Sequence, residues 1–314
     1  MKLVENRFKA IRVVTIFLAA TALITAALLV GGTKVSANHP VLVEGNCDSP
    51  VPGTTLVAPG TCGDFDGDGR IGTAEDTDGA DRIFGTLNAA LGPGTGAAAG
   101  TGANFNGRIL IVTSGRFAEQ LYIGQGGFGF PGGTSTPGNV EIEAATGVDA
   151  DIDAVLQGDP AGGNTTRQNG IGIMILYPAS VPPAVVSLRN LTIRNFSTGV
   201  AAALNSRVHI DRCRIENNLS NGALMIDSAT LTMTNTQATA NGRRNQDVAS
   251  PGNGLRVQDA ARARVSDSTF SHNVGSGIIN AGSGSVTVYK VGSFFNGTDS
   301  AGAITIAANP NFSN

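Results

Sequence analysis

The sequence of 314 residues contains no tryptophan, and only 5% of its residues are aromatic and 14% charged. The shortage of aromatic side chains means that a core must be built mainly from valine, isoleucine, leucine and alanine. After residue 34 the only lysine is Lys290, and the net charge of the chain is −3, which becomes more negative if the basic N-terminus is removed. An acidic chain of this kind argues against nucleic acid as a partner. Glycine, in contrast, is abundant with 43 residues, which favours many tight turns between short strands over long helices.

Cysteine is also scarce, with three residues in the whole chain. None of them has the Cys-x-x-Cys or Cys/His spacing of a zinc site. Cys47 and Cys62 flank a loop rich in proline and glycine, and in an exported protein a disulfide between them would contribute about 3 kcal/mol. Cys213 lies between Ile210 and Ile215, where an inward thiol fills core space.

The first 37 residues have the composition of an export signal. A basic start precedes an uncharged apolar run, Val13 to Val30, and then the small-residue site Val35-Ser36-Ala37 that favours signal peptidase. The alternative is an uncleaved membrane anchor, because the run approaches spanning length. If the signal is cleaved, we expect a secreted, periplasmic or cell-surface protein without a membrane span. Cleavage removes five basic residues and one acidic residue, which lowers the net charge from −3 to −7.

Residues 64–75 match the spacing of a twelve-residue, EF-hand-like calcium loop, which predicts Ca²⁺ as a cofactor. The expected ligands are carboxylates at loop positions 1, 3, 5 and 12 and a backbone carbonyl at position 7, namely Asp64, Asp66, Asp68, Glu75 and Arg70. Gly69 permits the sharp turn in the middle of the loop. The preceding residues 57–60 cannot form a good entering helix, so the loop resembles isolated, structural calcium loops of exported proteins. The alternative is a solvated acidic turn.

The stretch from Val186 to Ile306 repeats itself. Its apolar residues recur in alternating pairs, whose second members follow one another at intervals of 22, 23, 32 and 23: Leu188, Ile210, Met233, Val265 and Val288. A period in the low twenties is the signature of a solenoid of stacked coils. The long interval contains a nine-residue insertion around residues 242–247, where we expect an exposed loop.

Stacking places equivalent residues of successive coils above one another about 4.8 Å apart. We therefore expect the five apolar residues to form one inward column. A second set predicts a hydrogen-bonded asparagine ladder at a turn, where asparagine also tolerates left-handed backbone angles: Asn195, Asn218, Asn241, Asn273 and Asn296. Glycines follow a few residues later, at Gly199, Gly222, Gly254, Gly277 and Gly302.

The start of the solenoid is predicted to carry a short helix. Residues 81–91 have helical spacing, with Ile83, Phe84, Leu87 and Leu91 on one face. Such a helix would cover the first coil, because the end of a solenoid otherwise exposes core and strand edges. The expected organisation is a signal peptide at 1–37, a segment carrying the calcium loop at 38–80 and an all-β solenoid with this N-terminal capping helix at 81–314.

These patterns resemble a known superfamily. The helix Thr86-Leu87-Asn88-Ala89-Ala90-Leu91, followed by Ile111-Val112-Thr113-Ser114-Gly115-Arg116-Phe117-Ala118-Glu119, looks like the opening of right-handed parallel β-helix proteins of the pectin-lyase-like superfamily. Coils such as Leu188-Arg189-Asn190-Leu191-Thr192-Ile193-Arg194-Asn195, which leads to Gly199, are similar to its rungs. The resemblance covers about residues 81–306 and implies the fold. It leaves activity open, because enzymes and non-enzymes share these rungs.

The catalytic motifs of that superfamily are missing. The polygalacturonase-like branch carries Asn-Thr-Asp, Asp-Asp, Gly-His-Gly and Arg-Ile-Lys, and this chain has none of them. The weak candidates that remain are Asp227 and Asp259, which should stack on adjacent coils, and Arg243 and Arg244 of the inserted loop. Two close carboxylates shift each other's pKa and can act as acid and base or hold a cation. The alternative is a polar outer surface with an exposed loop.

Two further polar groups have more than one interpretation. Asp149, Asp151 and Asp153 alternate along the chain, which fits either a second cation site or a solvated acidic turn. His209 and Asp211 alternate outward on a predicted strand.

Two function classes follow from the sequence. One is a secreted, calcium-binding, non-catalytic β-helix that binds extracellular polysaccharide or cell surfaces along its flat side. The other is a polysaccharide lyase or glycoside hydrolase with an atypical active site. The missing motifs and sparse basic residues favour the first. After Ile306 no helix is predicted to cover the last coil: Phe312 folds back over it, another chain covers it in an oligomer, or the chain is incomplete.

Overall fold

The structure is a computed structural model that describes residues 41–44, 55–56, 70–71, 83–84, 86–91, 107–124, 139–154, 170–177, 185–242 and 252–307. Several predicted features lie outside these ranges: the export signal, Cys47, Cys62, Arg243, Arg244, Phe312 and every calcium ligand except Arg70.

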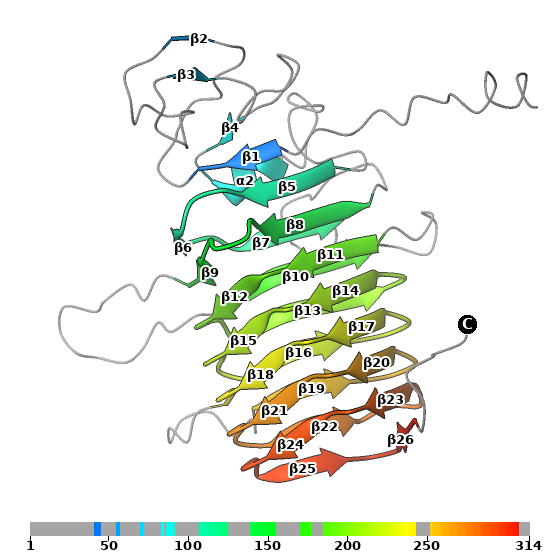
Figure 1. Ribbon diagram of the computed structural model, residues 1–314. Helices are drawn as coiled ribbons and strands as arrows, with labels where there is room; N and C mark the ends of the chain where they lie inside the picture. The colour runs from blue at the N-terminus through cyan, green and yellow to red at the C-terminus, as the bar shows by residue number, and fades with distance from the viewer. Residues whose placement is uncertain are drawn as a thin grey trace, which may run out of the picture. The chain divides into compact units, whose positions relative to one another are not determined.

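Three parallel sheets make up almost all of the described structure (Figure 1). Sheet 1 contains, in order of pairing, β4 (Ile83–Phe84), β1 (Val41–Val43), β5 (Gly107–Ile111), β8 (Val140–Ala144), β11 (Val185–Arg189), β14 (Arg207–Asp211), β17 (Thr230–Thr234), β20 (Arg262–Ser266), β23 (Ser285–Tyr289) and β26 (Ile304–Ile306).

Sheet 2 contains β6 (Gly115–Phe117), β9 (Ala150–Asp153), β12 (Leu191–Arg194), β15 (Arg214–Glu216), β18 (Gln237–Thr239), β21 (Thr269–Ser271) and β24 (Gly292–Phe294). Sheet 3 contains β7 (Leu121–Gly124), β10 (Ile171–Tyr177), β13 (Thr198–Leu204), β16 (Asn221–Met225), β19 (Asn253–Val257), β22 (Ser276–Asn280) and β25 (Thr298–Ala301). Outside these sheets, β2 (Thr55–Leu56) pairs antiparallel with β3 (Arg70–Ile71), which places the backbone of Arg70 in a short ribbon.

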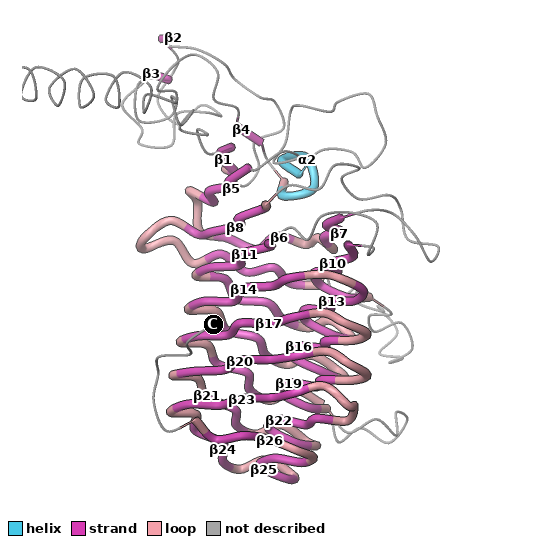
Figure 2. Tube along the Cα trace, turned by 90° about the vertical axis from the view of Figure 1, so that its right-hand side faces the viewer, coloured by secondary structure: helices cyan, strands magenta, loops and turns pink. Residues whose placement is uncertain are grey.

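Each coil visits sheets 1, 2 and 3 in turn, and each strand inside a sheet pairs with its equivalents one coil before and one coil after. Strand β11, for example, lies parallel between β8 and β14. Figure 2 shows the same stack of coils from the side. This is the predicted parallel solenoid. The described part of the chain has no helix that is long and apolar enough to span a membrane.

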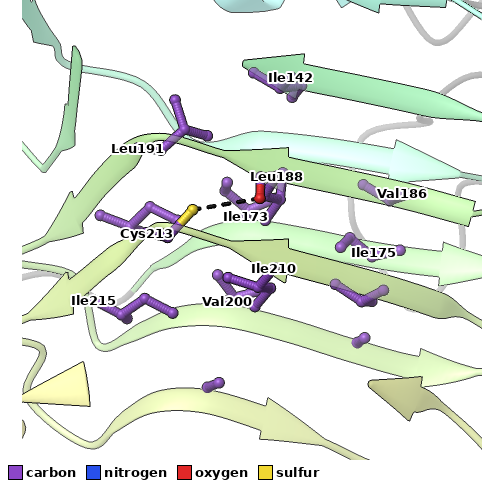
Figure 3. Packing of buried hydrophobic residues seen from close by; sticks show 14 of the residues in the cluster. Ile142, Ile173, Ile175, Val186, Leu188, Leu191, Val200, Ile210, Cys213 and Ile215 are labelled. Carbon is purple, nitrogen blue, oxygen red and sulfur yellow. Dashed lines mark hydrogen bonds between the residues drawn. The ribbon is translucent and has the colours of Figure 1, made fainter. Parts of the chain in front are cut away.

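The predicted inward column is confirmed. Strand pairing aligns Leu188, Ile210, Met233, Val265 and Val288 one above the next. The first four of these side chains are fully buried, and Val288 packs against the same cluster. Figure 3 shows how Ile142, Leu188 and Ile210 stack beside residues of the other two sheets. Burial of each such side chain contributes about 1.5–3 kcal/mol.

The predicted asparagine ladder is present, but it has four members and begins at Asn218. The side chains of Asn218, Asn241, Asn273 and Asn296 are linked by Nδ2–Oδ1 hydrogen bonds of 2.9–3.0 Å. The prediction that Asn195 belongs to this ladder is wrong. Register aligns Arg194 with Glu216, so Asn195 corresponds to the residue before Asn218, and Phe196 takes the ladder position. The backbone N–H of Phe196 donates to Asn218 Oδ1 at 3.0 Å.

The left-handed backbone angles lie one residue before the ladder, at the corner between sheets 2 and 3. They occur at residues of several types, namely Asn195, Asn217, Ala240, His272 and Phe295, with φ between 50° and 70°. The expected link between the ladder asparagines and left-handed geometry is therefore also wrong. The ladder residues are used for their side-chain amides, which bond between coils.

Four of the five recurring glycines, Gly199, Gly222, Gly254 and Gly277, align in one column. A Cβ atom on Gly222 would lie 2.7 Å from the carbonyl oxygen of Gly254 and 2.9 Å from Asn241 Nδ2, so no larger residue fits at this position between the next coil and the asparagine ladder. The fifth glycine, Gly302, does not belong to the column. Register aligns Ser276 with Thr298, which makes Asp299 the equivalent of Gly277.

The predicted helix at 81–91 is shorter than expected. Ile83 and Phe84 form strand β4, which pairs with β1, and only α2 (Leu87–Leu91) is helical. Pairing with a strand overrides the helical spacing of the first two residues. Leu87, Ala90 and Leu91 are buried in the core. Strand β1 pairs with both β4 and β5, so sheet 1 includes a strand from upstream of residue 81.

In the last coil, two of the three inward columns change from apolar residues to serine. The column of sheet 2 continues from Phe270 to Ser293, and that of sheet 3 continues from Ile278 to Ser300. Only sheet 1 stays apolar, with Ile304 and Ile306 aligned to the preceding valines. The core therefore becomes partly polar before the described chain ends.

Candidate functional site

The predicted acid pair lies at the corner where sheet 3 leads back to sheet 1. Asp227 and Asp259 stack on adjacent coils as expected, and both have left-handed backbone angles. The N–H of Leu204 donates to Asp227 Oδ2 at 3.2 Å, and the N–H of Asp227 donates to Asp259 Oδ2 at 3.4 Å. Both carboxylates thus accept a bond from the backbone of the coil before. This arrangement explains the two aspartates as turn residues.

The early coils of sheet 1 carry arginine and glutamate side chains in neutral pairs on their outer face. Arg108 bonds Glu143 at 2.6 Å, and Arg189 bonds Glu141 at 2.7 Å. Each pair joins neighbouring strands, so the charges compensate between coils. A part of the surface made in this way offers little net charge to a ligand.

The alternating aspartates before and in β9 form a comparable network with sheet 2. Asp153 is nearly fully buried and pairs with Arg116 Nε at 2.9 Å and with Arg194 Nε at 3.3 Å. Asp151 pairs with Arg194 as well. Burial raises the pKa of Asp151, and Arg194 only partly opposes this effect while Asp149 and Asp153 add to it. Two of the three aspartates are therefore engaged by arginines. Among the described residues, no three His, Cys, Asp or Glu side chains gather as a metal site.

His209 and Asp211 point outward from β14, as predicted. Burial alone would raise the pKa of Asp211, but hydrogen bonds from Asn235 Nδ2 at 3.0 Å and Thr234 Oγ1 at 2.8 Å, together with Arg212, lower it below its usual value. Asp211 is therefore held as a carboxylate by its neighbours. It acts as an anchor for the next coil and for Arg212.

The later coils of sheet 1 carry arginines without acidic partners. Arg207 on β14 and Arg262 and Arg264 on β20 are exposed. Within the described ranges, no carboxylate lies within ion-pair distance of these three guanidinium groups, in contrast to the early coils. We call Arg207, Arg262 and Arg264 the arginine grid.

Strand pairing sets the spacing of the grid. Arg207 aligns with Arg262 through Thr230, so two coil steps of about 4.8 Å separate their backbones by about 10 Å. Arg264 lies two residues further along β20, about 7 Å from Arg262, and aligns with His209 through Thr232. The result is a flat surface that presents guanidinium donors and threonine hydroxyls at fixed intervals.

A cleft lies at the corner between sheets 1 and 2. It has a volume of about 320 Å³ and is lined by Ala145, Thr146, Gly147, Val148, Asn190, Leu191, Thr192, Arg212 and Arg214. Arg212 Nε bonds Asp211 at 3.1 Å, and Arg214 Nε bonds Glu216 at 2.5 Å. Each guanidinium is thus fixed through one of its five N–H groups, and more than half of each side chain is exposed. The cleft offers oriented donors for an anionic or hydroxyl-rich group.

Comparisons with known proteins agree with this architecture. A family model described as "Right handed beta helix region" matches residues 149–291. The chain is a right-handed parallel β-helix.

A crystal structure of pectate lyase Pel9A is also similar, with a TM-score of 0.30 and 17% sequence identity over 64% of this chain and 68% of that chain. This similarity is too low to support an inference about activity. No curated protein matches the chain.

The arginine grid was not predicted from the sequence. The signal was present in the repeat. Arg262 and Arg264 flank the inward Ala263, so both must point outward, and the 23- and 32-residue intervals bring Arg207 into the same column as Arg262. The sequence also separates this face from the early coils, because β8 carries two glutamates whereas β17 and β20 carry no acidic residue.

Proposed function

We propose that this protein is an exported, non-catalytic β-helix that binds anionic polysaccharide along the later coils of sheet 1. The single observation that carries the proposal is the arginine grid. Three exposed guanidinium groups share a rigid, flat face and lack acidic partners among the described residues. Guanidinium groups bind carboxylate and sulfate oxygens through paired N–H donors.

The negative net charge of the chain without its predicted signal implies that a polyanion binds at one local site and not over the whole surface. With the predicted signal removed, the net charge is −7, so a polyanion is repelled by the protein as a whole. Binding must then depend on local complementarity. The rows of threonine hydroxyls beside the arginines suit the sugar hydroxyls of a polymer that lies across the coils. The cleft at Arg212 and Arg214 supplies a further set of donors near one border of this face.

The proposal is tested by retention of the purified protein on immobilised polymers. The panel contains polygalacturonate, dextran sulfate and neutral dextran, each at about 50 mM and about 500 mM salt. We expect retention on one or both of the charged polymers at low salt and release at high salt, because exposed ion pairs are screened. Equal retention on neutral dextran, or no retention on either polyanion, would refute the proposal.

The second candidate is a polysaccharide lyase or glycoside hydrolase with an atypical site. It is favoured by the position of Asp227 and Asp259 at the corner that leads into β17 and β20, three residues before Thr230 and Arg262. Product release from polygalacturonate is measured for the wild type and for Asp227→Asn and Asp259→Asn. Turnover that both substitutions abolish would establish this function and contradict a binding-only role.

Calcium binding by residues 64–75 and export remain part of the proposal. The loop spacing supports the first, and the N-terminal composition supports the second. A bound Ca²⁺ would be held by Asp64, Asp66, Asp68, Glu75 and the carbonyl of Arg70.

A further inference from the structure

The last coil exposes large apolar side chains. Phe294, Phe295 and Ile306 are 43%, 76% and 82% exposed, and they are the only exposed large hydrophobic residues in the part of the chain that the structure describes. All three belong to the final coil, on β24, on the corner after it and on β26. Large exposed apolar side chains that are confined to one coil indicate an interaction surface.

The same coil also ends the three sheets. Within the described ranges, strands β24, β25 and β26 each pair on one side only, with β21, β22 and β23. Their other side presents backbone N–H and C=O groups, which are a template for pairing with another chain. Figure 1 shows these three strands together at one end of the stack. A partner that pairs with all three must itself carry three strand edges in the same arrangement.

The other end of the stack differs. There α2 packs Leu87, Ala90 and Leu91 into the core, and Glu119 accepts the N–H groups of Leu87 and Asn88 at 2.8 and 2.7 Å. At this end sheet 1 continues by two strands, β1 and β4, beyond the coil that contains β6 and β7, so within the described ranges the three sheets do not end at one level as they do in the last coil. The C-terminal end of one copy is therefore complementary to the C-terminal end of another copy and not to its N-terminal end.

We propose that two copies of this chain associate through their last coils, end to end, about a two-fold axis perpendicular to the solenoid. In this arrangement one of the three edge strands pairs with the same strand of the second copy. Each of the other two edge strands pairs with the remaining edge strand of the second copy, and all three pairings are antiparallel. Because the interface uses the same surface of both copies, the assembly closes as a dimer and does not grow into a filament.

The aromatic side chains at the corner after β24 would pack against the second copy in such an interface. The ring of Phe295 lies 5.3 Å from that of His272 in the preceding coil and 5.6 Å from that of Phe294, with its opposite side exposed. Ile306 continues the inward column of sheet 1, so its exposed side chain meets apolar atoms only if another layer follows. A second copy supplies this layer, whereas a single bound peptide strand covers only one of the three edges.

The dimer is tested by light scattering of the purified protein after size exclusion at about 10 µM. We expect twice the mass of one chain for the wild type. A charged side chain at the interface should weaken association at least ten-fold, so Ile306→Glu and Phe295→Glu should each elute as monomers. Thr232→Glu, which places the same charge on an exposed strand residue far from the last coil, should remain dimeric.

Thermal unfolding of each variant distinguishes loss of association from loss of fold. The proposal predicts that Ile306→Glu monomers keep the far-ultraviolet circular dichroism of the wild type. A monomeric wild type, open-ended assemblies, or a dimer that survives both substitutions would overturn it. A monomeric wild type that Ile306→Glu destabilises would instead mean that residues 308–314 cover the coil. These outcomes are independent of polysaccharide binding.

Discussion

Every non-glycine residue with a positive φ in the described ranges lies at a corner between two sheets, and the chemistry of these residues varies widely. Asparagine and aspartate are common there and were expected, because their side chains ease left-handed geometry. Leu204 occupies the corner position of Asp227, and Ala240 and Phe295 occupy that of Asn217, although each such residue costs about 1–2 kcal/mol. Stacking of the flanking strands sets the backbone at these corners, so residue preference alone does not predict them.

Cys213 illustrates a residue whose role the sequence did predict. Its flanking isoleucines implied an inward thiol, and the structure buries it with Sγ 3.4 Å from the carbonyl oxygen of Leu188 (Figure 3). Burial raises the pKa of this thiol to about 12. The thiolate, which is the reactive form, is therefore nearly absent at neutral pH.

We predict that Cys213 resists a thiol reagent such as dithionitrobenzoate in the native protein at pH 8 and reacts only when the protein unfolds. The number of thiols that react is counted with and without denaturant. Cys213→Ala serves as the control, because it should remove one equivalent from the denatured count and none from the native count. Rapid reaction of Cys213 under native conditions would show that the coil opens locally.

At the scale of elements, the repeat predicted the strands more accurately than the turns. The period located the inward positions of sheet 1 from β11 to β23, because inward residues must be apolar and alternate. It misplaced Asn195 by one residue, since the coil containing it has Phe196 where later coils have asparagine. The spacing of apolar residues in 81–91 also failed to separate β4 from α2, because pairing with β1 depends on contacts distant in sequence.

The ladder leads to a prediction about stability. Asn241 accepts bonds from the N–H and Nδ2 of Asn218 at 3.2 and 3.0 Å and donates to Ile215 and Asn273. Asn241→Ala would leave several of these buried groups without partners. We expect the free energy of unfolding to fall by about 2–4 kcal/mol.

This change is measured by urea denaturation followed by circular dichroism. Thr232→Ala is the matched control: it removes an exposed polar side chain from the neighbouring strand and should alter stability by less than about 0.5 kcal/mol. If the two variants unfold at the same urea concentration, the ladder does not stabilise the stack.

At the scale of the whole molecule, the solenoid could be predicted from the sequence and the ligand-binding surface could not. The repeat fixes which residues face inward, and the same alternation fixes which face outward. The repeat does not predict which charged side chains on the outer face form ion pairs with one another. That depends on register between coils, which pairs Arg108 and Arg189 with glutamates but leaves Arg207 and Arg262 aligned with threonine.

The predicted calcium loop, residues 64–75, precedes the coils, so calcium binding is tested on the full chain. We predict that calorimetric titration with Ca²⁺ shows one saturable site with a dissociation constant on the order of 10⁻⁴–10⁻³ M, as in extracellular modules. Asp64→Ala should abolish it. Asp149→Ala, which alters the acidic turn before β9, should not. Unchanged binding in Asp64→Ala would mean that residues 64–75 form a turn without a metal.

The central claim is that the arginine grid binds polyanions, and one comparison of affinities tests it most directly. Calorimetry is performed at about 50 mM salt with whichever polymer the wild type retains. The double substitution Arg262→Gln/Arg264→Gln is compared with Arg256→Gln, which removes an arginine that likewise has no ion pair in the described ranges but lies on sheet 3. We predict at least ten-fold weaker binding for the double variant and unchanged binding for Arg256→Gln. Equal affinity of all three proteins would contradict the account.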